Sequence, residues 1–126
     1  MDILYVGIGG GAGSIFRFLV STLVNRFNPA HAFPLATFTA NITGCILIGI
    51  LLGFSSKQPW MADANMKLLL VTGFCGGYTT FSTFSFESLQ LLENHQYIPF
   101  ALYVAGSVIL GIGGVALGFF LASVEH

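Results

Sequence analysis

A run of hydroxyl side chains near the middle of the third apolar segment is the part of the sequence best suited to chemistry. Six of the ten residues from 79 to 88 are serine or threonine, and Phe81, Phe84 and Phe86 are interleaved with them. A hydroxyl donates a hydrogen bond and an aromatic ring has an electropositive edge, so both can face an anion. The pattern favours a site for a small anion. Hydroxyls bonded back to their own helix and ordinary aromatic packing are the alternatives.

Three glycines precede this run and weaken the helix that it belongs to. Gly73, Gly76 and Gly77 lie directly before Thr79, which is close to the midpoint of the segment. A helix break inside a membrane is tolerated only where protein or a water-filled cavity receives the freed backbone groups. Freed carbonyls would suit a small cation, whereas freed amides and hydroxyls would suit an anion. We therefore expect a helix that is broken at its centre, beside an ion.

A few further polar residues lie inside otherwise apolar segments. Asn41 carries an amide donor, although asparagine can also simply join two helices. Arg17 either extends to the membrane interface or draws anions into a vestibule. Glu87 lies about two turns from the centre of its helix and can line the same path. Tyr103 and Ser107 are one turn apart and so share a helix face.

Several classes of function are disfavoured. Residues 7–12 fit a dinucleotide-binding glycine pattern, but no Asp or Glu occurs between Asp2 and Asp63, where that motif needs an acidic partner. Glycines spaced by four residues instead predict close packing of helix backbones, and the pairs are Gly9/Gly13, Gly49/Gly53, Gly73/Gly77 and Gly114/Gly118. Cys45 and Cys75 lie in apolar runs without further soft ligands beside them, which is typical of small buried side chains. No nucleophile–base pair is present, and a net charge of −1 gives no reason to expect a nucleic acid partner. An enzyme is not expected.

The composition indicates the elements that must position these residues. The chain has 126 residues, of which 55% are hydrophobic and 7% charged, whereas soluble domains carry about 25% charged residues. Four segments, 3–24, 35–54, 67–91 and 99–124, reach the roughly 20 apolar residues that a membrane crossing requires. Segments of this length are helices rather than barrel strands. We predict an all-α integral membrane protein, one four-helix domain over residues 1–126, with a retained first helix.

The distribution of charge leaves the orientation in the membrane undecided. With four crossings, Lys57 and Lys67 share one side, while Arg26, together with Arg17 near the end of the first helix, belongs to the other. Orientation normally follows an excess of such residues on the cytoplasmic side, and almost no excess exists here. Insertion in both orientations is therefore possible. It would allow an antiparallel homodimer, and four short helices need a second copy to shield a polar path from lipid.

Three stretches of the sequence together resemble one known family. They are residues 10–13 (GGAG) followed by Arg17, residues 39–44 (TANITG), and above all residues 73–84 (GFCGGYTTFSTF). The whole chain resembles the Fluc fluoride channels, also called CrcB-type camphor-resistance proteins. The resemblance implies a dual-topology homodimer in the bacterial inner membrane, with two pores that let cytoplasmic fluoride leave passively.

The resemblance also assigns roles to individual residues. It implies a structural sodium ion at the centre of the dimer, held by the main-chain oxygens of Gly76 and Thr79. Phenylalanine edges, hydroxyls and an amide would line the pores, with an arginine at the vestibule. The residues to which the resemblance assigns this pathway are Arg17, Thr37, Asn41, Phe81, Thr83, Phe84, Glu87, Tyr103 and Ser107.

Two other functions compete with this interpretation. Small four-helix multidrug exporters also form antiparallel dimers, but they rely on a carboxylate within the first helix, and here only Asp2 lies at its edge. A cation channel would use the carbonyls at the break. One ion held by four oxygens, with no acidic ring continuing the path, is more typical of a structural site.

Overall fold

A computed structural model describes residues 2–28, 33–55 and 57–124, and within these ranges every regular element is helical. The three long helices are α1 (Asp2–Arg26), α2 (Leu35–Phe54) and α7 (Tyr97–Val124). Between α2 and α7 lie shorter helical pieces. They are α3 (Pro59–Ala62), α4 (Ala64–Lys67), the π-helix η1 (Leu68–Cys75), α5 (Gly76–Tyr78) and α6 (Phe81–Glu93).

The three long helices are each long and apolar enough to cross a membrane. The bounds predicted for the second helix, 35–54, are confirmed, with Pro34 directly before its first residue. Proline has no N–H to lose at a helix start, which explains the boundary. The first and last helices are longer than predicted, because α1 continues to Arg26 and α7 begins at Tyr97.

The predicted third span, 67–91, is divided among several pieces, none of which alone reaches the length of a crossing. One continuous helical stretch runs from Ala64 through η1 to Tyr78. Thr79 (φ −88°, ψ 159°) and Thr80 (φ −148°, ψ 125°) are then extended, and α6 starts at Phe81. The Thr80 hydroxyl caps α6 by accepting a hydrogen bond from the Thr83 N–H at 3.3 Å.

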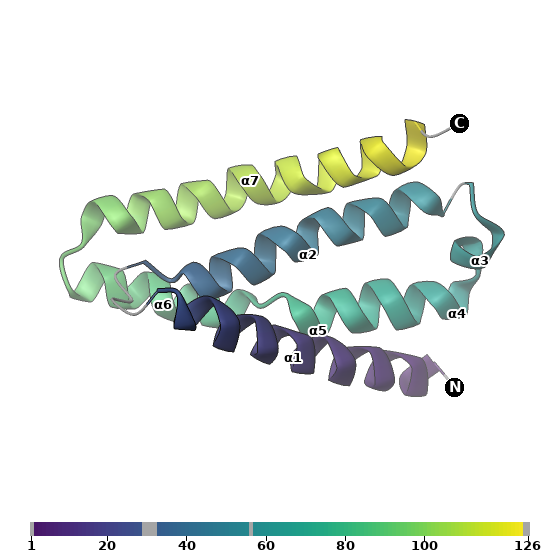
Figure 1. The fold of residues 1–126 in the computed structure, drawn as a ribbon, viewed down its shortest axis with the longest axis horizontal. Coiled ribbons are helices and arrows are strands. Elements are labelled where there is room, and N and C mark those ends of the chain that lie inside the picture. Colours follow the sequence, from purple (N-terminus) through teal and green to yellow (C-terminus); the bar gives the residue numbers. More distant parts are fainter. Residues whose placement is uncertain (1, 29–32, 56, 125–126) are drawn as a thin grey trace.

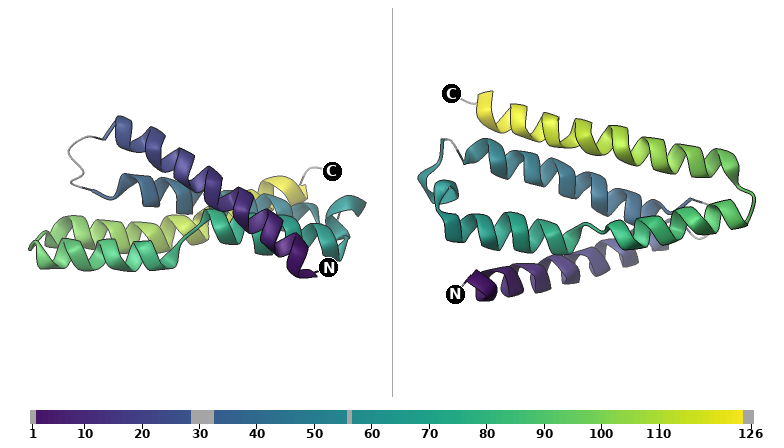
Figure 2. Two further views of the ribbon diagram at one scale, coloured as in Figure 1. Left: turned by 90° about the horizontal axis from the view of Figure 1, so that it is seen from below. Right: turned by 180° about the vertical axis from the view of Figure 1, so that it is seen from behind.

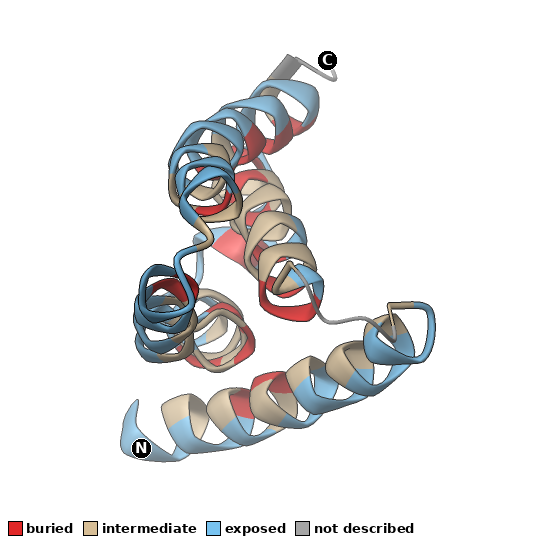
Figure 3. Cartoon of the chain, turned by 90° about the vertical axis from the view of Figure 1, so that its left-hand side faces the viewer, coloured by how far each residue is buried: buried red, intermediate tan, exposed pale blue. Residues whose placement is uncertain are grey.

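The helices form an elongated bundle in which α2 and α7 run side by side (Figure 1). The start of α1, the end of α7 and the short helix α3 lie at the same end of the molecule. Seen from below, α1 crosses the other helices obliquely (Figure 2), and it packs against η1 and α5. Buried residues are confined to the faces where helices meet, and the outer faces are exposed (Figure 3). Apolar outer faces of this kind are what a membrane-embedded chain requires.

Glycines allow the helix backbones to approach closely. A Cβ at Gly13 would lie 2.8 Å from the Tyr78 nitrogen, and one at Gly49 would lie 2.9 Å from the Phe119 nitrogen. Real side chains do not come so near to backbone atoms, so both helix pairs depend on glycine. The predicted close packing is confirmed for the pairs Gly9/Gly13, Gly49/Gly53 and Gly73/Gly77 and for Gly118. At Gly114 the nearest atom to an added Cβ would be a side-chain carbon of Ile46 at 3.2 Å.

Candidate functional site

Two cavities adjoin the extended residues between α5 and α6. The first has a volume of about 430 Å³ and is lined mainly by polar side chains. The second is a more open groove of about 530 Å³ with mainly apolar walls. Thr80 lines both of them. The helix interruption therefore lies between a polar space and an apolar one.

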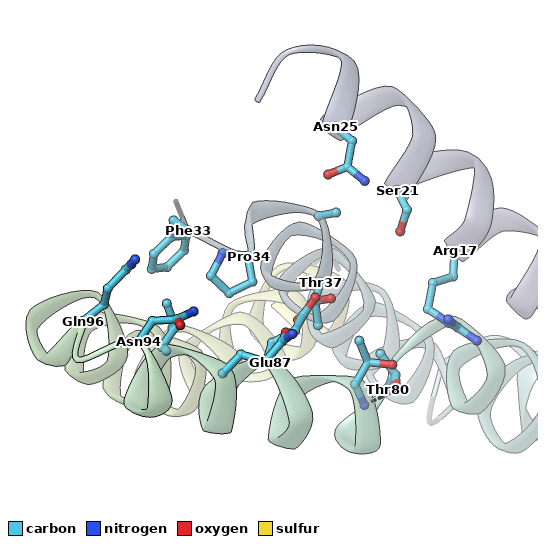
Figure 4. Close-up of a pocket in the computed structure, with 14 residues that line it drawn as sticks. Arg17, Ser21, Asn25, Phe33, Pro34, Thr37, Thr80, Glu87, Asn94 and Gln96 are labelled. Carbon is cyan, nitrogen blue, oxygen red and sulfur yellow. Dashed lines mark hydrogen bonds between the residues drawn. The ribbon is translucent and has the colours of Figure 1, made fainter. Parts of the chain in front are cut away.

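The polar cavity gathers four of the residues predicted for an ion pathway. Arg17 reaches it from α1, Thr37 from α2, and Thr83 and Glu87 from α6. Figure 4 shows Arg17 reaching down from α1 on one side of Thr80, with Glu87 lying close to Thr37 on the other. One cationic and one anionic side chain thus face the same space. The cavity has the composition of a vestibule for small hydrated ions.

Tyr103 lines neither cavity but contacts a residue of each. Its side chain is fully buried, and its hydroxyl donates a hydrogen bond to Glu87 Oε1 at 2.9 Å. Its ring lies 5.0 Å from the ring of Phe84, centroid to centroid, and 5.4 Å from that of Phe33. The Tyr103 side chain therefore contacts the Glu87 carboxylate of the polar cavity at one end and the groove-lining ring of Phe84 along its side.

The apolar groove contains the other predicted pathway residues. Asn41, Phe81, Phe84 and Ser107 line it. Phe81 is 79% exposed, and its ring lies 5.8 Å from that of Phe84. Among the described residues, Ser107 Oγ is the one buried side-chain polar atom without a hydrogen-bond partner. Leaving a buried donor unpaired is unfavourable, so this hydroxyl is available to a ligand.

Asn41 bonds to both backbone groups of Thr80. Its Nδ2 donates to the Thr80 carbonyl at 3.1 Å, and its Oδ1 accepts from the Thr80 N–H at 2.8 Å. An amide nitrogen carries two hydrogens, so one donor remains for the groove. In a continuous helix the Thr80 N–H would instead reach the carbonyl of Gly76. The Asn41 side chain thus replaces a helical hydrogen bond and holds the interruption in place.

Arg17 holds the other side of the interruption. Its Nε donates to the Gly77 carbonyl at 3.2 Å, and Ser14 Oγ lies 3.5 Å from the same oxygen. The last carbonyls of a helix lack partners and carry partial negative charge, which a guanidinium offsets. The two predicted alternatives for Arg17 were extension to the interface and attraction of anions. The structure adds a third role, that of capping α5 while lining the polar cavity.

Gly76 and Thr79, the predicted sodium ligands, both line the apolar groove. A Cβ at Gly76 would have no atom within 4 Å, so the space beside its α-carbon is open. The Thr79 N–H and hydroxyl both bond to the Cys75 carbonyl, at 3.0 and 2.9 Å. In a continuous helix the Gly76 carbonyl would accept from the Thr80 N–H, and the Thr79 carbonyl would accept from the Thr83 N–H. Both donors are bonded to side chains instead, the first to Asn41 and the second to Thr80.

Comparison with known proteins identifies the family. Residues 4–119 match the family model described as CrcB-like protein, Camphor Resistance (CrcB). The chain belongs to the CrcB-like family. A relative from Azobacteroides pseudotrichonymphae is 48% identical over 94% of each chain, and one from Phocaeicola vulgatus is 46% identical over 96% of this chain and 98% of its own. A third, from Flavobacterium psychrophilum, is 43% identical over 95% of each chain. All three are named fluoride-specific ion channel FluC.

This CrcB-like chain also contains site residues that sequence reasoning missed. Thr80 belongs to the hydroxyl run but had no role assigned, although it lines both cavities. Phe33 and Phe38 surround Tyr103, with ring centroids at 5.4 and 6.4 Å from it. A contact between α2 and the end of α5 joins Thr43 Oγ1 and the Tyr78 hydroxyl at 2.8 Å. The position of Thr80 next to the expected break was the one signal that could have indicated its role.

Proposed function

We propose that this protein is a fluoride channel that lets fluoride cross the membrane passively. The chain belongs to a family whose curated relatives are named fluoride-specific ion channels, and a channel rather than an enzyme is the activity that follows. The geometric observation that carries the proposal is the buried, unpaired hydroxyl of Ser107, in the same groove as Phe84 and Asn41. Fluoride accepts hydrogen bonds strongly, so it is a fitting partner for that donor.

The proposed path runs from the polar cavity past Tyr103 into the groove. Arg17 raises the local concentration of anions at the entrance through its positive charge. The hydroxyls of Thr37 and Thr83 replace part of the hydration shell of the fluoride ion. Glu87 is held in place by the hydrogen bond from Tyr103. Beyond Tyr103, the ring edges of Phe81 and Phe84, the free Asn41 N–H and the Ser107 hydroxyl supply positive partial charge without a full charge.

Two features support a dimer. The groove is open on one side, and Phe81 within it is 79% exposed. A second copy that covered this face would shield the hydroxyl path from lipid. Together with the balanced charges of the loops, this favours an antiparallel homodimer of two four-span subunits, in which the piece from Ala64 to Glu93 forms the interrupted third span. Such a dimer would contain two pores.

The residues at the interruption fit a structural sodium ion. The carbonyls of Gly76 and Thr79 have lost their helical donors, and both residues line one groove. Hard cations prefer oxygen ligands, and a two-fold partner would double the two carbonyls to four. We propose that these carbonyls hold sodium in the dimer. The ion would fix the interruption by offsetting the charge of the carbonyls.

The proposed role in the cell follows from weak-acid chemistry. HF enters from acidic surroundings, ionises in the cytoplasm and is trapped as fluoride. In a bacterial inner membrane the negative potential drives the anion outward through a passive channel, at about 2.3 kcal/mol per charge for each 100 mV.

The test is ion efflux from liposomes that contain the purified protein, measured with fluoride, chloride and sodium electrodes. We expect rapid fluoride efflux, little chloride efflux and no sodium efflux. Ser107→Ala should slow fluoride efflux, while Ser85→Ala, which alters an exposed hydroxyl of the same run, should not. Sodium efflux would instead favour a cation channel. Drug transport without fluoride efflux would favour a multidrug exporter, and no flux of any kind would refute the channel.

A further inference from the structure

The hydroxyl of Thr80 occupies a position from which it controls a backbone carbonyl. Thr80 Oγ1 accepts the Thr83 N–H at 3.3 Å. In a helix that continued through this point, the Thr83 N–H would bond to the carbonyl of Thr79. The side chain of Thr80 therefore takes the donor that would otherwise pair with that carbonyl.

Asn41 does the same for the carbonyl one helical turn earlier. Asn41 Oδ1 accepts the Thr80 N–H at 2.8 Å, and that donor would otherwise reach Gly76. The second half of the contact, from Asn41 Nδ2 to the Thr80 carbonyl at 3.1 Å, fixes the plane of the peptide that follows Thr80. Two side-chain acceptors thus replace two main-chain acceptors, and the two carbonyls released are those of Gly76 and Thr79.

The surrounding packing keeps the helix from closing again. The Thr79 side chain lies against the backbone of Gly44, where an added Cβ would also come 3.1 Å from a Tyr78 ring carbon. Tyr78 is itself 8% exposed and is joined to Thr43 through its hydroxyl. The end of α5 is therefore held against α2, whose residue Gly44 also lines the groove. Both Gly76 and Thr79 line the groove, and the space beside the Gly76 α-carbon is open.

We propose that Thr80 is a positioning residue for the cation site, because its hydroxyl diverts the Thr83 N–H and leaves the Thr79 carbonyl free for sodium. This inference rests on the proposed function, in which those carbonyls hold the ion. Thr80 acts through another residue's backbone and does not itself bind the cation. Asn41 has the matching effect on Gly76, which couples one wall of the fluoride path to the cation site.

The proposal gives Thr80→Val a specific consequence. Valine keeps the shape and the β-branched preference for extended backbone but lacks the acceptor. Without that acceptor the Thr83 N–H bonds to the Thr79 carbonyl in part of the population. The conformation in which this carbonyl is free to bind sodium is then less populated. The apparent affinity for sodium falls in proportion to the fraction of protein in which the Thr79 carbonyl is free. We expect the sodium concentration for half-maximal effect to rise by up to about tenfold, which corresponds to about 1.4 kcal/mol.

The experiment measures the thermal stability of the full-length dimer in detergent, and its fluoride efflux in liposomes, across a sodium series at constant ionic strength. Thr80→Ser restores the hydroxyl and should return the sodium midpoint to within about twofold of the unmodified protein. Thr22→Val removes an exposed hydroxyl bonded to its own helix, at Phe18, and serves as the matched control.

The midpoint distinguishes positioning from plain destabilisation. Loss of an ordinary helix cap lowers the stability by the same amount at every sodium concentration and leaves the midpoint unchanged. A raised midpoint in Thr80→Val, reversed in Thr80→Ser, supports the proposal. An unchanged midpoint overturns it, as does a dimer whose stability is independent of sodium. If Thr80→Val yields no dimer, Thr80→Ala, which removes the same hydroxyl, is measured in the same way.

The stability series separates this inference from the proposed function. Absence of fluoride efflux in the unmodified protein would refute the channel, while the dependence of dimer stability on sodium would still test Thr80. Normal fluoride efflux with a sodium midpoint that Thr80→Val leaves unchanged would refute the inference and leave the channel in place.

Discussion

Replacement of Gly13 by alanine perturbs the contact between α1 and the interrupted segment at a single point. The added Cβ would lie 2.8 Å from the Tyr78 nitrogen and 3.0 Å from the Phe74 carbonyl carbon. Both are backbone atoms of a packed helix, so neither can rotate out of the way. The ordinary contact distance begins near 3.4 Å. The Phe74 carbonyl oxygen would be nearer still, so helix α1 must move away from η1 and α5 by more than about half an ångström.

The energetic consequence combines two opposing effects. Overpacking at a close contact costs about 1–3 kcal/mol, whereas replacing a mid-helix glycine by alanine gains up to about 1 kcal/mol in helix propensity. Gly11→Ala provides the matched control, because a Cβ there meets nothing within 4 Å. Gly11→Ala should be neutral or stabilising. The difference between the two variants then measures the steric effect alone, at about 1–3 kcal/mol.

The displacement should also impair ion flow. Arg17 is one turn beyond Gly13 on α1, and its Nε donates to the Gly77 carbonyl at 3.2 Å. Moving α1 outward lengthens this bond beyond hydrogen-bond range. We expect at least a tenfold loss of fluoride efflux in Gly13→Ala, on the scale of about 1.4 kcal/mol per factor of ten. Thermal unfolding in detergent tests the predicted loss of stability, and fluoride efflux monitored with an electrode tests the predicted loss of ion flow. Equal stability and equal efflux in both alanine variants would refute the packing argument.

Further predictions concern the site and the assembly. Asn41→Asp keeps the acceptor for the Thr80 N–H but removes the donor to the Thr80 carbonyl and adds a repelling charge, so fluoride efflux should fall at least tenfold while the dimer survives on size-exclusion chromatography. Phe81→Ile and Phe84→Ile should each reduce efflux sharply without unfolding, whereas Tyr or Met should be tolerated better; unchanged efflux in both Ile variants would indicate ordinary packing. Added lysines on one loop should fix the orientation of every copy, and such a chain should be inactive alone and active when coexpressed with a copy fixed the other way.

The sequence alone determined the membrane class and most of the helical pattern. A chain with 7% charged residues cannot cover a soluble surface, and Pro34 marks the start of α2 without any tertiary information. The spacing of Gly9, Gly13, Gly73 and Gly77 indicated close helix contacts because small residues repeat on one helix face. Three glycines before a run of hydroxyls likewise indicated where regular helix would be hard to maintain.

The tertiary structure alone decided which polar groups are paired and which are free. Arg17 lies 60 residues from Gly77 in the sequence, and Asn41 lies 39 residues from Thr80. No local pattern predicts that these side chains meet, because the contacts depend on how α1 and α2 cross the interrupted segment. The availability of Ser107 depends in the same way on what its neighbours leave unbonded. A hydrogen bond is satisfied by geometry over a few ångströms, whereas residue type records only the capacity to form one.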